Sequence, residues 1–436
     1  KFIAGTCINV GCTPTKTLIA SGRVAYLTKR SADYGVNTTG HSVDIEAVIK
    51  RKNAHVLSAR ESSTKRLLET QNLDVVFGNA VFSGPKEVTI TKEDGSIATM
   101  TAEKIFINIG TRPAIPPIPG LSEVHYYTSD TILDLLAIPS HLAIIGGSYI
   151  ALEFGQLYRR LGSEVTIIEG NEQFLSKEDA DIAAEIKKIL EEDGIRILTG
   201  TKVNKVMANV SVPGDRIDIE LETANGATAP AVTQTITASH LLIATGRLPE
   251  TAALNPGVAG IITDKHGFIT VDGKLQTNIP GIYALGDVKG GPQFTHISYN
   301  DYVILYKNLI GNADLSITGR ETIYCLFTDP ELGRVGLTEK MAKEQGFNIK
   351  VVTLPASRIA RAWENDEARG MLKAIVNLDN KMILGAAMLC FNGGELMSIL
   401  QMAMMGNVTY DRIRDAVFAH PTFAESLNNL FARVDQ

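Results

Sequence analysis

The segment from residue 141 to residue 198 limits the possible folds of this chain more than any other feature. An apolar run ends at Gly146 and Gly147, a helical pattern follows, and a second apolar run ends at Glu169. A further helical pattern and a third apolar run complete the segment. Strands that alternate with amphipathic helices in this order form a βαβαβ unit around a parallel sheet. We therefore predict an α/β fold with a dinucleotide-binding unit in this region.

The turn after the first of these strands is the candidate nucleotide site. A dinucleotide fold places the pyrophosphate against a glycine turn and the N-terminus of the next helix. Against the pattern G-x-G-x-x-G/A, Gly146 makes the turn, Ser148 replaces the second glycine, and Ala151 allows close helix packing. Gly147 lies in the same turn and is a further candidate contact.

Glu169 indicates which dinucleotide binds there. An acidic residue at the end of the second strand accepts hydrogen bonds from ribose hydroxyls and repels a 2'-phosphate. The sequence therefore favours NADH over NADPH. The alternative is a solvated glutamate at a strand end.

A second feature with chemical meaning is the pair Cys7 and Cys12 at the entry to a predicted helix. Their spacing differs from C-x-x-C, and no nearby pair of Cys or His completes a zinc site. A redox disulfide fits, because Gly11 lets the backbone bring the two Cα atoms together and a helix start lowers a thiol pKa. Two buried structural cysteines are the alternative. Cys325 and Cys390 lie in apolar, strand-like segments, which predicts inert packing.

Composition excludes several classes of protein. The 42 basic and 48 acidic residues give a net charge of -6, which offers no electrostatic footprint for nucleic acid or an anionic membrane. No apolar run reaches the length of a membrane span. Four cysteines are too few for a secreted disulfide framework, so the cytoplasm is the expected compartment.

The remaining patterns place other elements around the nucleotide unit. Apolar residues at helical spacing predict helices over 17–30 and 44–71, and alternating patterns predict strands and hairpins over 75–110. The proline-rich stretch 111–120 is neither helix nor central strand. Beyond the nucleotide unit we expect a helix at 297–310, followed by an α+β region.

Five sequence blocks together resemble one known family. GTCINVGCTPTK, around the two cysteines, resembles the active-site signature of the class I pyridine nucleotide-disulfide oxidoreductases, the family of glutathione reductase, dihydrolipoamide dehydrogenase and mercuric reductase. The other blocks resemble the family's two flavin-contacting turns, its carboxyl-side flavin motif and its C-terminal catalytic segment. They are IFINIGTRP with Gly110, LLIATGR with Gly246, TNIPGIYALGDV with Asp287, and FAHPTFAESLNNLF with His420 and Glu425.

The resemblance implies two Rossmann-like dinucleotide-binding domains and a C-terminal α+β dimerisation domain, assembled as a symmetric homodimer. The implied ranges are 1–125 for the FAD-binding domain, 126–250 for the NAD(P)-binding domain, 251–315 for a continuation of the FAD domain and 316–436 for the dimerisation domain. The family opens with a βαβ unit that holds the ADP half of FAD, and this chain starts after that point. We expect the full protein to contain that unit.

The resemblance also assigns catalytic roles. Cys12 would face the flavin, and Cys7 would exchange with substrate. His420, oriented by Glu425, would act as acid and base from the other subunit of the dimer.

Further residues would hold the cofactors. By the same resemblance, Lys16 and Glu153 would pair beside flavin N5, and each explains the other, because a buried Lys and a buried Glu are costly unless matched. Tyr149 would gate the nicotinamide pocket, and Asp287 would bind the ribityl chain. The remaining implied cofactor contacts are Thr6, Gly110, Gly246, Arg247, Thr295 and His296.

The implied function is an FAD-dependent NAD(P)H:disulfide oxidoreductase that reduces a small-molecule disulfide or oxidised-sulfur substrate. The mercuric-reductase-like branch is the most similar, yet no cysteine follows Cys390, so the C-terminal cysteine pair of mercuric reductases is missing. The reactive-chlorine-resistance flavoproteins, which this chain resembles in ASRIARAW and HPTFAESLNNLF, are another candidate subgroup. Mercuric ion reductase and dihydrolipoamide dehydrogenase are alternatives. A non-catalytic redox sensor that uses the Cys7–Cys12 disulfide as a switch is a rival of another class, and a flavin-only NADH oxidase is a third possibility.

Overall fold

The structure is a computed structural model that describes residues 2–209, 211, 216–225 and 229–436. The chain forms two compact units, each assembled from separate stretches. The first unit contains residues 1–17, 50–115 and 246–320. The second contains residues 18–49, 116–245 and 321–436.

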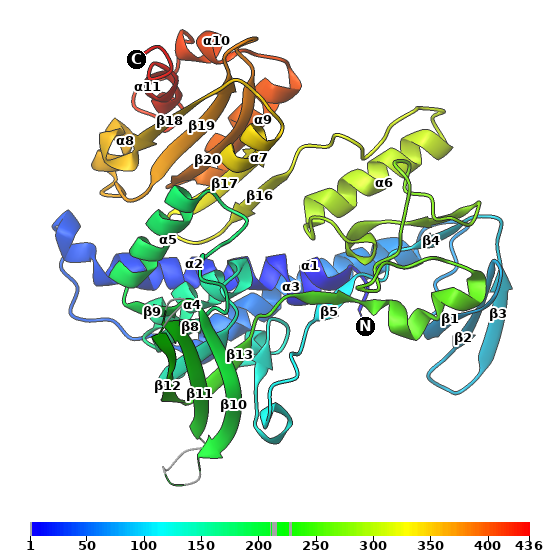
Figure 1. Cartoon of the computed structure of the whole chain (residues 1–436). Helices are drawn as coiled ribbons and strands as arrows, with labels where there is room; N and C mark the ends of the chain where they lie inside the picture. Colours follow the sequence, from blue (N-terminus) through cyan, green and yellow to red (C-terminus); the bar gives the residue numbers. More distant parts are fainter. Residues whose placement is uncertain (1, 210, 212–215, 226–228) are drawn as a thin grey trace. The chain divides into compact units, whose positions relative to one another are not determined.

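The first unit combines small sheets with helices (Figure 1). It contains α1, the start of α2, most of α3, and α6, whose bounds are Gly5–Val10, Cys12–Lys29, Ile45–Leu68 and Thr295–Leu309. Its strands are β1 (Asn79–Gly84), β2 (Glu87–Thr91), β3 (Ile97–Thr101), β4 (Ile105–Ile107), β5 (Thr111–Pro113), β14 (Arg247–Pro249) and β15 (Ile282–Ala284). Its 3-10 helices are η4 (Glu250–Leu254), η5 (Pro256–Ala259) and η6 (Gly286–Lys289).

Three sheets organise this unit. Strands β1, β2 and β3 form an antiparallel meander, β4 pairs in parallel with β15, and β5 pairs antiparallel with β14. A cluster of buried side chains that includes Phe82, Ile107, Ile269 and Ile282 packs these strands together. Burial of such apolar side chains stabilises a unit by roughly 1.5–3 kcal/mol for each residue. The strands predicted over 75–110 are therefore confirmed, although residues 75–78 precede the first of them.

The nucleotide-binding part of the second unit is built around a parallel sheet. Its five parallel strands follow the order β6-β13-β7-β8-β9. The bounds are β6 (Tyr127–Thr128), β7 (His141–Ile145), α4 (Tyr149–Leu161), β8 (Glu164–Ile168), α5 (Ala180–Glu192), β9 (Ile195–Leu198) and β13 (His240–Ile243). Three further strands, β10 (Thr201–Asn209), β11 (Arg216–Asn225) and β12 (Ala229–Ala238), form an antiparallel sheet. The βαβαβ unit predicted from residue 141 is confirmed.

The burial of its strands and the positions of two glycines explain why this region folds as it does. Residues 142–145 of β7 are all buried, as expected for a central parallel strand that is covered on both faces. Helix α4 ends at Gly162, which adopts the left-handed conformation typical of a helix C-terminus. Helix α2 packs closely on α4, since a Cβ added at Gly22 would lie 2.9 Å from Leu157 Cδ1.

The C-terminal part of the second unit has an antiparallel sheet of five strands in the order β16-β17-β20-β19-β18. The strands are β16 (Ile323–Leu326), β17 (Glu331–Gly336), β18 (Ile349–Pro355), β19 (Met371–Asn377) and β20 (Ile383–Cys390). The helices are α7 (Glu339–Glu344), α8 (Ala360–Glu364), α9 (Gly393–Met405), α10 (Tyr410–Arg414) and α11 (Ser426–Phe431). Short 3-10 helices of this unit are η1 (Ser31–Tyr34), η2 (Leu121–Glu123), η3 (Ile132–Asp134) and η7 (Ala356–Arg358).

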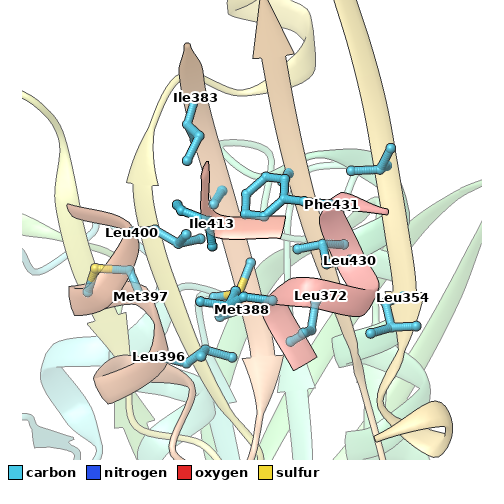
Figure 2. Close-up of a cluster of buried hydrophobic side chains, with 14 of the residues drawn as sticks. Leu354, Leu372, Ile383, Met388, Leu396, Met397, Leu400, Ile413, Leu430 and Phe431 are labelled. Atoms are coloured by element: carbon cyan, nitrogen blue, oxygen red, sulfur yellow. The ribbon is translucent and has the colours of Figure 1, made fainter. Parts of the chain in front are cut away.

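The core of this part lies between the sheet and its helices. Figure 2 shows Leu372 and Met388 of the sheet facing Leu396 of α9 and Leu430 of α11. All four side chains are at most 2% exposed, and Leu372, Met388 and Leu430 are fully buried. Residues 426–431 are thereby fixed to the sheet, and the segment that precedes them is held at its surface.

The sequence-based α/β class and the α+β character of the C-terminal part are confirmed. The helices expected at 17–30, 44–71 and 297–310 correspond to α2, α3 and α6. The four domain ranges stay a prediction. None of the described helices combines the length and apolar character needed to cross a membrane.

Candidate active site

The two cysteines lie on consecutive helices of the first unit. Cys7 is in the middle of α1 and Cys12 begins α2, with Gly11 between the two helices. The backbone passes so close there that a Cβ on Gly11 would lie 2.9 Å from Thr6 O and 3.3 Å from Cys7 Cα. Glycine is therefore required at this position for the turn that brings the two cysteines together.

The two sulfurs share a small polar environment. Cys7 hydrogen-bonds the side chain of Cys12, and Cys12 Sγ lies 3.3 Å from Thr295 Oγ1 at the start of α6. The hydrogen bond to Cys12, followed by burial, raises the pKa of the Cys7 thiol well above its usual value, although Thr295 acts in the opposite direction. The lowering of the thiol pKa expected from the helix start is therefore wrong for Cys7, and at neutral pH a base must remove its proton before it acts as a nucleophile.

Asn9 and Arg60 hold this turn in place, and sequence reasoning missed both. Asn9 Nδ2 donates to Ile3 O at 2.9 Å and to Gly5 O at 2.8 Å. Arg60 Nε donates to Asn9 Oδ1 at 2.6 Å. Asn9 could have been suspected because it lies between the cysteines, whereas nothing in the sequence connects it to Arg60, 51 positions away.

The two predicted flavin-contacting turns also meet in the first unit. The antiparallel pair β5–β14 places Gly110 and Gly246 at its ends, and Ala114 N donates to Gly246 O at 2.9 Å. Both glycines have positive φ, +71° and +108°, which side chains rarely adopt. A Cβ added at either glycine would meet no atom within 4 Å, so the backbone at both turns borders open space.

Asp287 lies in η6 next to these turns and joins a chain of polar contacts. Thr111 Oγ1 donates to Asp287 Oδ2 at 3.3 Å, and Arg247 Nε donates to Thr111 Oγ1 at 2.8 Å. Burial raises the pKa of the Asp287 carboxyl, while Arg247, Thr111 and Lys289 oppose the rise. A half-buried carboxylate beside open backbone is an acceptor suited to the hydroxyl groups of a flavin side chain, so the residues present fit that group.

The nucleotide turn of the second unit has the geometry that its sequence predicts. Gly146 has φ +105°, and a Cβ there would lie 2.3 Å from Ala244 O. Ser148 is the N-cap of α4, and Tyr149 is the first residue of that helix. The N-terminus of α4 therefore lies at the turn, where its backbone N–H groups can bind a pyrophosphate.

Glu169 forms hydrogen bonds within the protein, in addition to its predicted contact with the ribose of the dinucleotide. Its Oε2 accepts from Gly147 N at 2.7 Å, and its Oε1 accepts from the backbone and side-chain nitrogens of Asn171. A Cβ at Gly147 would lie 2.8 Å from the same Oε2, which explains the glycine. The carboxylate is thus held at the end of β8, and an ionised carboxyl group retains further lone pairs for a ribose.

Glu153 is buried in α4 and has a contact that the sequence did not predict. Its Oε1 accepts from Phe327 N at 3.0 Å, which fastens the segment after β16 to the helix. The pairing of Glu153 with Lys16 stays a prediction, as do the cofactor contacts of Thr6, Thr295 and His296.

His420 and Glu425 form a pair on the C-terminal segment of the second unit. His420 Nδ1 lies 2.9 Å from Glu425 Oε2, and the His420 side chain is 68% exposed. Glu425 directly precedes α11, and Asn428 of that helix donates to the carbonyl oxygens of Ile413, Arg414 and Ala416. The imidazole is therefore oriented by a carboxylate through Nδ1, which leaves Nε2 directed away from the pair for proton transfer.

Comparison with known proteins agrees with this geometry. A family model described as pyridine nucleotide-disulphide oxidoreductase matches residues 2–301, and the dimerisation-domain model of the same family matches residues 322–431. The chain belongs to the pyridine nucleotide-disulphide oxidoreductase family. It is an FAD-dependent disulfide oxidoreductase, and this family uses FAD together with NADH or NADPH.

Individual relatives cover nearly the whole chain. The probable pyridine nucleotide-disulfide oxidoreductase RclA of Escherichia coli is 38% identical over 99% of this chain and 91% of its own length. A mercuric reductase of Staphylococcus aureus is 34% identical over 98% of this chain and 75% of its own length. A solved structure described as a Cu(II) complex of the HOCl-induced flavoprotein disulfide reductase RclA from Escherichia coli superposes with a TM-score of 0.88, at 36% identity over 99% of this chain and 91% of that one.

The two remaining cysteines differ from the pair at the start of the chain. Cys390 is fully buried in β20, and burial raises the pKa of its thiol. Cys325 lies in β16. Within the described residues, no group of three or more His, Cys, Asp or Glu side chains is arranged to hold a metal ion.

Proposed function

We propose that this oxidoreductase uses NADH to reduce a small-molecule disulfide or another oxidised-sulfur compound through Cys7 and Cys12. The observation that carries the proposal is the contact of these two cysteines with each other and with Thr295, in the unit that also contains the Gly110 and Gly246 turns. FAD, held by Asp287 and by the Gly110 and Gly246 turns, would supply the two-electron chemistry that links the nicotinamide to the Cys7–Cys12 disulfide.

The dithiol would then reduce the substrate in two exchanges. The Cys7 thiolate attacks one substrate sulfur, a mixed disulfide forms, and the first substrate thiol leaves with a proton. Cys12 attacks the Cys7 sulfur, which restores the enzyme disulfide and releases the second thiol. Two electrons and two protons pass to the substrate, which balances one disulfide against two thiols.

A screen of electron acceptors tests this function directly. We expect the protein to turn over NADH with glutathione disulfide, lipoamide or hypothiocyanite many times per active site, and to be slower with Hg(II) and Cu(II). The measurement is NADH oxidation at 340 nm under anaerobic conditions. Rapid turnover with Hg(II) and none with sulfur compounds would instead support a mercuric ion reductase.

We expect His420 to supply the base that the raised pKa of Cys7 demands. Replacing His420 by Gln should reduce disulfide turnover by about 10²- to 10⁴-fold, the usual range for loss of a general acid–base, while NADH still reduces the flavin. Glu425→Gln, which keeps an acceptor for His420 Nδ1 without the charge, should reduce disulfide turnover less than the His420 variant does. The exposed His266→Gln is the matched control and should retain activity.

The same variant tests whether the site is shared between subunits. We infer a homodimer in which His420 of one chain serves the cysteines of the other, in line with the matched dimerisation domain. Mixed dimers of His420→Gln and Cys12→Ser chains then contain one complete site, so mixing two inactive variants should restore activity. No recovery in verified mixed dimers would place each His420 with the cysteines of its own chain.

Glu169 should set the preference for NADH. Replacing Glu169 by Gln removes the charge that repels a 2'-phosphate but keeps an acceptor for Gly147 N. We expect the ratio of kcat/KM for NADH to that for NADPH to fall by about tenfold, since like charges in contact disfavour binding. The nearby exposed Glu172→Gln should leave the ratio unchanged. An unchanged ratio in the Glu169 variant would contradict the assignment.

A further inference from the structure

Asp301 is a fully buried carboxylate in α6 that no sequence pattern singled out. Its Oδ2 accepts from Gly286 N at 2.9 Å and lies 3.3 Å from Lys289 Nζ. Its Oδ1 lies 2.7 Å from Arg320 Nη1. Both oxygens are therefore engaged, which is the condition under which a buried charge is tolerated.

These contacts fix the turn that contains Asp287. Gly286 and Lys289 are the first and last residues of η6, so Asp301 binds both ends of this short 3-10 helix. Gly286 has φ +72°, and a Cβ there would lie 2.9 Å from both Asn108 Oδ1 and Ser298 Oγ. The turn is thus tightly enclosed, and Asp301 supplies its ionic anchor.

Asp287 is held from two directions as a result. Its backbone belongs to the turn that Asp301 binds, and its side chain accepts from Thr111. The side chain of Lys289 is only 4% exposed, so its interaction with Asp301 is poorly screened by water. A shift of η6 after loss of this anchor would move the Asp287 carboxylate relative to the Gly110 and Gly246 turns.

We propose that Asp301 is a positioning residue for flavin binding, which acts by fixing Asp287. The inference rests on the proposed function, in which Asp287 binds the side chain of FAD. Asp301 itself is buried behind the turn, so it acts on the cofactor through the residue that it orients and not by contact.

A double-mutant cycle on FAD affinity tests this role. The probe is FAD added to protein from which flavin has been removed, with the dissociation constant measured by quenching of flavin fluorescence. Asp301→Asn and Asp287→Asn should each weaken FAD binding by about tenfold, the effect of losing a hydrogen bond to a charged group. The double variant should bind within about twofold of Asp287→Asn alone, because one residue acts through the other.

Two further variants keep the test decisive. Asp314→Asn breaks the exposed Asp314–Lys274 ion pair of the same unit and should leave FAD affinity unchanged. Arg320→Gln removes one partner of Asp301 and should weaken binding by about threefold, again without adding to Asp287→Asn. Arg320→Gln tests the same role if Asp301→Asn does not fold.

Several outcomes would overturn the inference. They are unchanged affinity in both Asp301→Asn and Arg320→Gln, or losses that multiply to about a hundredfold in the double variant, as independent structural effects would. An unaltered wild-type protein that binds no FAD would instead refute the proposed function. The two failures are therefore distinguishable.

Discussion

Replacing Cys12 by Ser is expected to abolish NADH-dependent disulfide reduction, with a loss of at least about 10³-fold in kcat. Serine cannot form the disulfide with Cys7 through which electrons reach the substrate. Cys7→Ser should have the same effect on disulfide turnover, since the exchanging sulfur is missing. The measurement is steady-state NADH oxidation with the disulfide identified in the acceptor screen, together with the flavin content of each variant.

Cys325→Ser is the matched control, and we expect it to retain turnover because Cys325 belongs to β16 and not to the segment that contains the candidate redox pair. Persistent disulfide turnover in Cys12→Ser would contradict the proposed path of electrons. Oxygen consumption that is unchanged in Cys7→Ser and exceeds disulfide turnover would favour a flavin-only NADH oxidase. Stoichiometric reduction of the wild-type protein without turnover would favour a redox switch.

Replacing Asp329 by Ala should destabilise the second unit by about 3–5 kcal/mol, the usual cost of removing one partner from a buried ion pair. Asp329 Oδ2 pairs with Arg23 of α2 and lies 2.7 Å from Arg160 Nη1 of α4. Among the described residues, no other carboxylate lies within ion-pair distance of Arg160, and its Nε and Nη2 are buried without a hydrogen-bond partner. The variant would leave Arg160 as an uncompensated buried charge. The measurement is the urea concentration at the midpoint of the unfolding transition of this unit.

The effect should depend on pH in a defined direction. Burial works to raise the pKa of the Asp329 carboxyl, but Arg160 and Arg23 outweigh it and hold the pKa below the usual 3.8. A carboxyl with a lowered pKa in the folded state stabilises fully above pH 3.8 and loses that contribution as the pH falls through the lower, folded value. The difference between wild type and Asp329→Ala should therefore be constant near neutral pH and shrink below pH 3.8.

Asp366→Ala provides the control within the same group of side chains. Asp366 pairs with Arg30, but its side chain is 60% exposed, so the pair should contribute less than about 1 kcal/mol. Equal losses in the Asp329 and Asp366 variants would show that burial does not set the strength of these pairs.

Short-range features of the site could be predicted from the sequence because their chemistry lies within a few neighbouring residues. The cysteine pair with Gly11, the turn from Gly146 to Glu169, and His420 with Glu425 are each contained in one short segment. Strand and helix periods over 141–198 likewise predicted a parallel sheet, since each strand must be buried on both faces.

Sequence alone therefore determined the motifs that are typical of the family, the α/β class and the identity of the candidate redox pair. The tertiary structure decided which distant residues support them. Arg60 hydrogen-bonds Asn9, and Thr111 and Asp301 hold the η6 turn. Asp329 pairs with both Arg23 and Arg160. The reason is physical. Local patterns follow from the geometry of a helix or strand, whereas a buried charge needs a partner that folding alone brings within reach, at any separation along the chain.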